Sequence, residues 1–306
     1  MIVWSVPSRS IIPKGALPED KKPAEHETMI DVKRIFTLPV SLQRRITVLN
    51  DLLVKLQPGI IAVSGGLDSR LLAALAKAWE LDYRAAFLSG PHLTPQEAFQ
   101  GRLCLEQLGL PGRAGTFSPL ENEQAAQNSV QRCYFCKKAM IKRIRALFQQ
   151  ADSLSLLEGS HASDQESYRP GALALHEEGV HSPLAQAGLN KSDLRTCAHS
   201  LGLADPEQPS RACLMTRFAY GISPAEPQLT ALGQAEDELR GLGLRHFRIR
   251  LGPANQAWLQ VDQSDAVAVE HLQKKVQASL VRSGFAQAEL LICNGVSGFF
   301  DQSQPG

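Results

Sequence analysis

Residues 64–69, Ser-Gly-Gly-Leu-Asp-Ser, place two glycines, a carboxylate and two hydroxyl groups between two apolar segments. The apolar run Ile-Ile-Ala-Val precedes them, and an apolar helical pattern follows at once. A glycine-rich turn at the start of a helix leaves backbone N–H groups unpaired, and these groups bind phosphate with help from the helix dipole. The alternative is an ordinary strand-to-helix turn that Asp68 or Ser69 caps. The string matches neither a Walker A loop nor a dinucleotide-binding fingerprint.

Cysteines supply a second kind of chemistry. Cys133 and Cys136 form a single C-x-x-C, which provides two of the four ligands that a structural zinc site usually needs. Cys213 lies in PSRACLMTRFAYG between Arg211 and Arg217. Guanidinium groups lower the pKa of a nearby thiol and enrich the nucleophilic thiolate, so this motif predicts a reactive cysteine. The alternative is a cysteine that packs as a small hydrophobic residue.

Basic side chains near these motifs are candidate phosphate ligands. Lys137 directly follows the C-x-x-C and could reach a phosphate. The alternative is that it belongs to an ordinary basic helix face in contact with water, which would give the same sequence pattern. In the strand pattern HFRIRL, Arg248 and Arg250 share one face because side chains alternate along a strand. Two guanidinium groups about 7 Å apart suit a phosphate or a pair of carboxylates. An ordinary solvent-exposed face explains the pair equally well.

Hydrophobic periodicity predicts the elements that position these residues. Helices are expected over residues 38–56, 70–79, 94–109, 140–150 and 192–202, with strands at 60–63, 82–90 and 153–159. Thr94 and Ser192 are the expected N-caps of the third and fifth helices. Alternating strands and helices indicate a parallel sheet, whose ligands bind at the carboxyl ends of the strands. The loops after Val63 and Leu157 are therefore expected on the ligand side.

The pattern changes after about residue 217, which indicates a second domain. A helix over 227–243, strands at 246–251 and 257–262, a helix over 264–284 and a strand at 288–293 form a small α+β unit. Residues 1–42 carry scattered proline and lysine and little periodicity, so we interpret them as a partly disordered extension. The predicted divisions are 1–42, 43–217 and 218–306.

Composition excludes several classes of protein. The 306 residues are 43% hydrophobic and 21% charged, as in a soluble globular protein, and no apolar run reaches membrane-spanning length. The net charge of +1 gives no overall basic surface for nucleic acid. The start of the chain does not resemble a signal peptide, so a cytoplasmic location is expected, with the six cysteines free, catalytic or metal-bound.

The motifs SGG-x-DS, RCYFCK, EGSHASD…YRPG, SPLAQAGLNKSDLR, PSRACLMTRFAYG and FRIRL resemble, in this order, the LarE family over about residues 45–265. The resemblance implies an α/β fold, in which a parallel-sheet PP-loop ATP pyrophosphatase domain (adenine nucleotide alpha hydrolase-like) is fused to a smaller α+β domain. Family members are ATP-dependent sulfur transferases of nickel-pincer nucleotide cofactor synthesis. They adenylate the carboxylates of pyridinium-3,5-biscarboxylic acid mononucleotide and convert them to thiocarboxylates. The family also suggests a homo-oligomer.

The resemblance assigns roles to particular residues. The pyrophosphate-binding loop corresponds to Ser64, Gly65, Gly66, Asp68 and Ser69, the nucleotide segment to Gly159 and Asp164, and the paired arginines that hold the substrate's phosphate to Arg248 and Arg250. Lys137 and Arg217, which stand in the two cysteine motifs, are further candidate substrate contacts. Cys213 matches the sulfur-donating cysteine, and Asp68 is the expected contact to the Mg²⁺ that accompanies ATP. In one branch of the family the donor cysteine becomes dehydroalanine, whereas in another a cysteine-held iron–sulfur cluster supplies the sulfur. We favour the first route, because no other cysteine lies close to Cys213 along the chain.

The sequence departs from the family pattern at two places, and other functions compete. Gln260 replaces a family acid near a metal site, and PEQP replaces Trp-Asp-Lys-Pro before the cysteine motif. A tRNA thiolase would need a dominant basic surface. An amidotransferase-type synthetase would use ammonia and would not need Cys213. An inactive nucleotide-binding homologue is the non-enzyme alternative.

Overall fold

The computed structural model describes residues 30–166, 170–286 and 288–301. A parallel sheet of four strands forms the centre of the first domain, in the order β3-β2-β1-β4. The strands are β1 (Gly59–Ala62), β2 (Tyr83–Ser89), β3 (Gly112–Thr116) and β4 (Ser155–Leu157). This confirms the predicted α/β class with a parallel sheet, while β3 escaped prediction because its sequence, GRAGT, lacks an apolar pattern.

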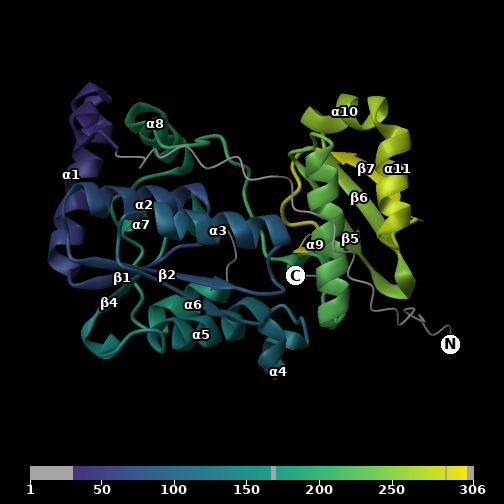
Figure 1. The fold of residues 1–306 in the computed structure, drawn as a ribbon, viewed down its shortest axis with the longest axis horizontal. Coiled ribbons are helices and arrows are strands. Elements are labelled where there is room, and N and C mark those ends of the chain that lie inside the picture. The colour runs from purple at the N-terminus through teal and green to yellow at the C-terminus, as the bar shows by residue number, and fades with distance from the viewer. Residues whose placement is uncertain (1–29, 167–169, 287, 302–306) are drawn as a thin grey trace.

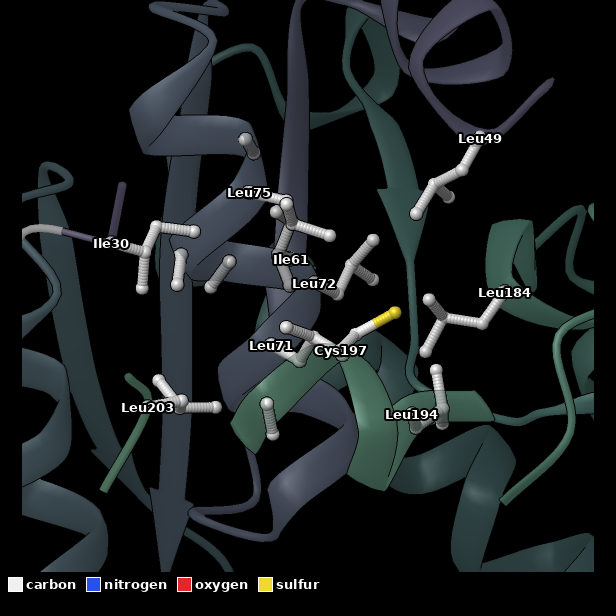
Figure 2. Close-up of a cluster of buried hydrophobic side chains, with 14 of the residues drawn as sticks. Ile30, Leu49, Ile61, Leu71, Leu72, Leu75, Leu184, Leu194, Cys197 and Leu203 are labelled. Carbon is white, nitrogen blue, oxygen red and sulfur yellow. The ribbon is translucent and has the colours of Figure 1, made fainter. Parts of the chain in front are cut away.

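Helices cover both faces of this sheet (Figure 1). On one face lie α2 (Leu67–Ala78) and α3 (Pro95–Gln107), with α1 (Val40–Leu56), α7 (Pro183–Gln186) and α8 (Lys191–Leu201) nearby. The other face carries α5 (Arg132–Arg145) and α6 (Pro170–Glu177), and α4 (Glu123–Ala126) precedes α5. Figure 2 shows the core between α2 and its neighbours, where Leu71, Leu72 and Leu75 meet side chains from β1, α1 and α8. Cys197 of α8 is buried in this core and packs as an apolar residue.

Three helix boundaries differ from the predictions. Helix α2 begins at Leu67 rather than Arg70, so Asp68 and Ser69 lie in its first turn and Gly66 is the N-cap. Helix α5 begins at Arg132 rather than Met140, which places the C-x-x-C in its first turn. Asn190, not Ser192, caps α8 through a capping box with Asp193. In each case the helix begins nearer the N-terminus than predicted, because the added turn contains polar residues that interrupt the apolar periodicity.

The N-terminal region is described only from residue 30. The predicted extension therefore lies largely outside the described residues. Residues Val32–Thr37 form a 3₁₀ turn, and Ile30 and Leu38 are buried in the core of the first domain. The described chain thus joins the core before residue 43, the predicted start of the domain.

The second domain has its own sheet and core. Strands β5 (Phe247–Leu251) and β6 (Ala257–Asp262) are antiparallel, and β6 pairs in parallel with β7 (Glu289–Cys293). Helices α9 (Glu226–Gly241), α10 (Ala266–His271) and α11 (Gln273–Arg282) accompany this sheet, so the predicted helix 264–284 is interrupted at Leu272. Helix α9 faces α3 of the first domain, and the backbone N–H of Gln96 donates to the Asp237 carboxylate at 2.8 Å. In the described part of the chain, no helix is both long and apolar enough to cross a membrane.

Candidate active site

A pocket of about 410 Å³ opens at the carboxyl ends of β1 and β2, beside the segment that follows β4. Its lining comes from four parts of the sequence that are far apart. These are the loop residues Ser64, Asp68 and Ser69, the α5 residues Arg132, Cys133, Cys136 and Lys137, the β4 segment residues Glu158, Gly159 and Asp164, and Arg211 and Cys213. The loops after Val63 and Leu157 therefore both reach one pocket, as the parallel-sheet argument predicted.

The packing around the glycine-rich loop requires glycine at two positions, one in the loop and one in the segment after β4. Gly65 has φ of +77°, and a Cβ at this residue would lie 3.1 Å from the Cα of Gly101 in α3. At Gly159 a Cβ would lie 2.9 Å from the backbone nitrogen of Ser69, so the β4 segment packs directly on the first turn of α2. The first N–H groups of a helix have no partner within the helix, and Asp68 and Ser69 of the first turn of α2 line the pocket.

The two loop serines hold the turn together. The Ser69 hydroxyl is buried, accepts from the Ser64 amide at 3.1 Å and donates to the Gly66 carbonyl at 3.2 Å. The Ser64 hydroxyl accepts from the Gly66 amide at 3.3 Å. These bonds fix the backbone of residues 64–69 before any ligand arrives. Ser69 thus shapes the loop from within.

Asp68 lies in the first turn of α2 and pairs with a lysine from α8. Lys191 Nζ donates to Asp68 Oδ1 at 2.6 Å, across 123 residues of sequence. Asp164 lines the same pocket, and its carboxylate accepts from the His161 amide at 3.1 Å. A carboxylate and an ammonium group side by side at a phosphate loop can hold a divalent cation and phosphate oxygens together.

Three cysteines from two distant parts of the sequence line the pocket. Cys133 and Cys136 come from α5, and Cys213 comes from the segment before the 3₁₀ turn Leu214–Arg217. The sequence analysis treated Cys213 as isolated because no other cysteine lies near it along the chain. In the structure, Cys133 and Cys136 of α5 line the same pocket, so this reason no longer holds. Among the described residues, no three His, Cys, Asp or Glu side chains lie close enough together to hold a metal ion.

The acidity of Cys213 differs from the sequence prediction. Burial raises the pKa of the Cys213 thiol to about 11, and the Met215 amide and the Arg132 and Arg217 guanidinium groups only partly offset this effect. Burial also raises the pKa of Cys136. The expected low pKa is therefore wrong, because desolvation of the thiolate outweighs the attraction of the arginines.

Arg217 is buried in an ion pair outside the pocket lining. Its Nε and Nη2 donate to Glu236 of α9 at 2.8 and 2.9 Å, and its Nη1 donates to the Ala212 carbonyl at 3.1 Å. Both side chains of the pair are at most 1% exposed. This arrangement favours a positioning role over the predicted substrate contact, since Arg217 fixes the backbone next to Cys213.

Replacement of Glu236 by glutamine should lower the free energy of unfolding by about 3–5 kcal/mol, because it leaves Arg217 buried without its counter-charge. Arg217 lowers the pKa of Glu236 to about 2 in spite of burial. The pair therefore stabilises the fold above about pH 4.5, and this stability is lost as the pH falls toward 2. Urea unfolding of the wild type and Glu236→Gln at pH 7 and pH 4 checks both effects. The exposed Glu270→Gln is the control, with a change of at most about 0.5 kcal/mol; an equal change in both variants would contradict this account.

The arginine pair on β5 is not exposed as expected. Arg248 and Arg250 are 5% and 4% exposed, so the solvent-face explanation is wrong. Arg248 donates to the Phe247 and Ser210 carbonyls at 2.7 and 2.6 Å. Arg250 donates to Gln260 at 2.9 Å, to the Thr216 carbonyl at 2.8 Å and to the Val296 carbonyl. Neither arginine lines the 410 Å³ pocket, so their contact with a substrate phosphate stays a prediction.

The sequence analysis missed three polar groups of this site. Lys191 bonds to Asp68, Arg132 lines the pocket beside the cysteines, and Arg211 lies against the loop. Lys191 and Arg132 each stand in a motif already noted, NKSDLR or RCYFCK, but nothing local shows where their side chains reach. A second cavity of about 900 Å³ lies by α2 and α3, and Gly65 is the one residue of the loop that lines it.

Comparison with known proteins gives three relatives. The chain is 30% identical to an uncharacterized protein of Synechocystis over 68% of this chain and 78% of the relative. It is 30% identical to the pyridinium-3,5-bisthiocarboxylic acid mononucleotide synthase of Lactiplantibacillus plantarum, over 64% of this chain and 71% of the synthase. An uncharacterized protein of Methanocaldococcus jannaschii is 25% identical over 62% of this chain and 73% of the relative. No family model matches the chain.

Proposed function

The chain belongs to the LarE family, and from this we propose that it is an ATP-dependent, AMP-forming sulfur transferase. Its proposed substrate is pyridinium-3,5-biscarboxylic acid mononucleotide, one carboxylate of which becomes a thiocarboxylate. The observation that carries the proposal is that the glycine-rich loop with Asp68 and the cysteine motif with Cys213 line one pocket. The name of the Lactiplantibacillus relative, a synthase of the bisthiocarboxylic mononucleotide, supports this substrate class over tRNA.

The pocket suits the first step, transfer of AMP to the carboxylate. A carboxylate oxygen attacks the α-phosphorus of ATP, and the bond to the bridging oxygen breaks so that pyrophosphate leaves. The amides of residues 64–69 and the start of α2 would hold the departing pyrophosphate. Mg²⁺ supplies charge neutralisation when bound, and it usually takes one or two protein carboxylates together with phosphate oxygens. Asp68 fits that donor set, and Lys191 beside it adds a positive charge.

Cys213 suits the second step. Its thiolate attacks the carbonyl carbon of the acyl-adenylate, and AMP leaves with the electrons of its bond, which produces a thioester. Loss of the Cα proton of Cys213 to a base and breakage of its Cβ–S bond then leave the sulfur on the substrate. The residue becomes dehydroalanine. This balance needs no external oxidant or reductant.

A cysteine-held iron–sulfur cluster is the alternative sulfur source to test, because Cys133 and Cys136 line the same pocket as Cys213. Three thiols can hold an iron–sulfur cluster whose sulfur is transferred. In the described residues these side chains are not close enough together to form a ligand set, so the fit is incomplete and we route no step through a cluster. Joint dependence of sulfur transfer on all three cysteines would support the cluster.

Release of pyrophosphate tests the proposed function directly. With the pyridinium dicarboxylate mononucleotide present, the full-length protein should convert ATP to AMP and pyrophosphate and should form the thiocarboxylate. Without that substrate, pyrophosphate release should fall to background, since the acceptor oxygen is missing. ADP as the product, or equal release with and without the substrate, would contradict the proposal.

The rate of sulfur transfer should depend on pH. Because the Cys213 pKa is raised to about 11, the thiol is mostly neutral at pH 7, and the thiolate fraction grows with pH. Single-turnover thiocarboxylate formation should therefore rise about tenfold per pH unit between about pH 7 and 9. Pyrophosphate release, measured in the same samples, is the control and should change little. A flat rate of sulfur transfer over this range would show that attack by the Cys213 thiolate does not limit it.

A further inference from the structure

We propose that Arg211 binds the β- and γ-phosphates of ATP beside the glycine-rich loop and stays with the pyrophosphate as it leaves. The sequence analysis treated this residue only as a neighbour of Cys213. The inference rests on the proposed function, because it assigns a ligand group to a residue of that same pocket. It concerns pyrophosphate and not the pyridinium substrate.

The position of the guanidinium group carries the first part of the argument. Arg211 Nη1 lies 3.3 Å from the point that a Cβ on Gly65 would occupy, so it lies directly against the loop. Arg211 and Cys213 belong to one irregular stretch of backbone, and both line the 410 Å³ pocket. Arg211 also lines the 900 Å³ cavity together with Gly65, so its side chain lies between the two cavities at the loop. The segment therefore brings a cation to the phosphate loop and a thiol to the cysteine side of the same pocket.

The hydrogen bonds of Arg211 carry the second part. Its Nη2 donates to Gln100 Oε1 of α3, which fixes the plane of the guanidinium group. Its Nη1 is buried and has no hydrogen-bond partner in the described structure. A buried donor without an acceptor costs about 1–3 kcal/mol, and more when the group is charged. An anion that reaches Nη1 removes this cost, and Nη1 carries two N–H groups for it.

Charge favours phosphate as that anion. No carboxylate of the described residues forms an ion pair with Arg211, although Glu97 and Asp205 act on it from farther away. The Arg70 and Arg240 guanidinium groups add positive potential at Arg211. The Arg211 guanidinium group is partly removed from water, lies close to other cations and contacts the glycine-rich loop. Such a group binds a polyanion better than a single carboxylate.

Binding measurements on Arg211→Gln test the inference. We expect this variant to bind ATP, and inorganic pyrophosphate with Mg²⁺, about 10- to 100-fold more weakly than the wild type, the scale of a lost charged hydrogen bond. AMP lacks the β- and γ-phosphates, so its affinity should change by less than about twofold. Arg211→Lys keeps the charge without the planar fork and should fall between the wild type and Arg211→Gln for ATP. Calorimetric titration of each ligand gives the three affinities.

A matched control removes one arginine elsewhere. Arg195 of α8 pairs with Glu207 at 3.4 Å outside the pocket, and Arg195→Gln should bind all three ligands like the wild type. Equal weakening of ATP and AMP by Arg211→Gln would indicate a structural role and overturn the inference, as would unchanged ATP and pyrophosphate affinities in Arg211→Gln and Arg211→Lys. These results leave the proposed function intact if the wild type still releases pyrophosphate. A wild type that binds neither ATP nor pyrophosphate would overturn both.

Discussion

Replacement of Asp68 by alanine should reduce pyrophosphate release from ATP by at least about 100-fold, the effect of removing one electrostatic contact to a transition state. Asp68 is the carboxylate of the loop that lines the pocket, and the charge that develops on the departing pyrophosphate needs a cation that a carboxylate can hold. Its position in the first turn of α2 keeps it beside the glycines of the loop. Rapid quenching with radiolabelled ATP measures the released pyrophosphate.

Controls separate this chemistry from folding. The ion pair of Asp68 with Lys191 is about one-quarter exposed on both sides, so its loss should cost at most about 1 kcal/mol of stability. Asp51→Ala, at an exposed position on α1, should release pyrophosphate at the wild-type rate. Undiminished release by a folded Asp68→Ala protein would remove the loop from the proposed reaction.

Replacement of Cys213 by alanine should abolish sulfur transfer while pyrophosphate release continues. The thiol acts as the nucleophile and the sulfur source in the second step only, and the loop that carries out the first step lies elsewhere in the pocket. Because alanine fills nearly the same space, the fold should survive with a loss of about 1 kcal/mol. Chromatography of a single-turnover mixture should show AMP and an acyl-adenylate or its hydrolysis product, and no thiocarboxylate.

The other pocket cysteines provide the matched comparison. Cys133→Ser and Cys136→Ser should each retain sulfur transfer if the sulfur comes from Cys213. Loss of transfer in all three variants, together with a brown anaerobic protein, would instead indicate a cysteine-held cluster. A Cys213→Ala protein that still produces thiocarboxylate would exclude Cys213 as the donor.

The loop was predictable from the sequence because the features that define it are local. A buried strand, two glycines and the start of a helix follow one another within residues 59–70, so the turn and its place at the carboxyl end of β1 needed no long-range information. The capping box of Thr94 and Glu97 was found for the same reason. The contact of Lys191 with Asp68 could not be predicted from the sequence, because it joins α8 to α2, which are far apart along the chain.

Burial explains the expectations that failed. Alternation along β5 correctly put Arg248 and Arg250 on one face, but periodicity cannot show whether a later segment covers that face. Here Val296 accepts from Arg250, and the ring centre of Phe299 lies 5.4 Å from its guanidinium carbon. The prediction of a low pKa for Cys213 failed in the same way, since its sequence neighbours are arginines but tertiary packing partly buries the thiol.

The mass of the intact protein after a single turnover tests the central claim most directly. The full-length enzyme is mixed with ATP and the pyridinium dicarboxylate mononucleotide, and the masses of the protein and of the small molecules are measured by mass spectrometry. The account predicts that each thiocarboxylate formed is matched by one AMP and by one protein chain lighter by the mass of H₂S, with the loss mapped to Cys213. Thiocarboxylate formed by a protein of unchanged mass would contradict it.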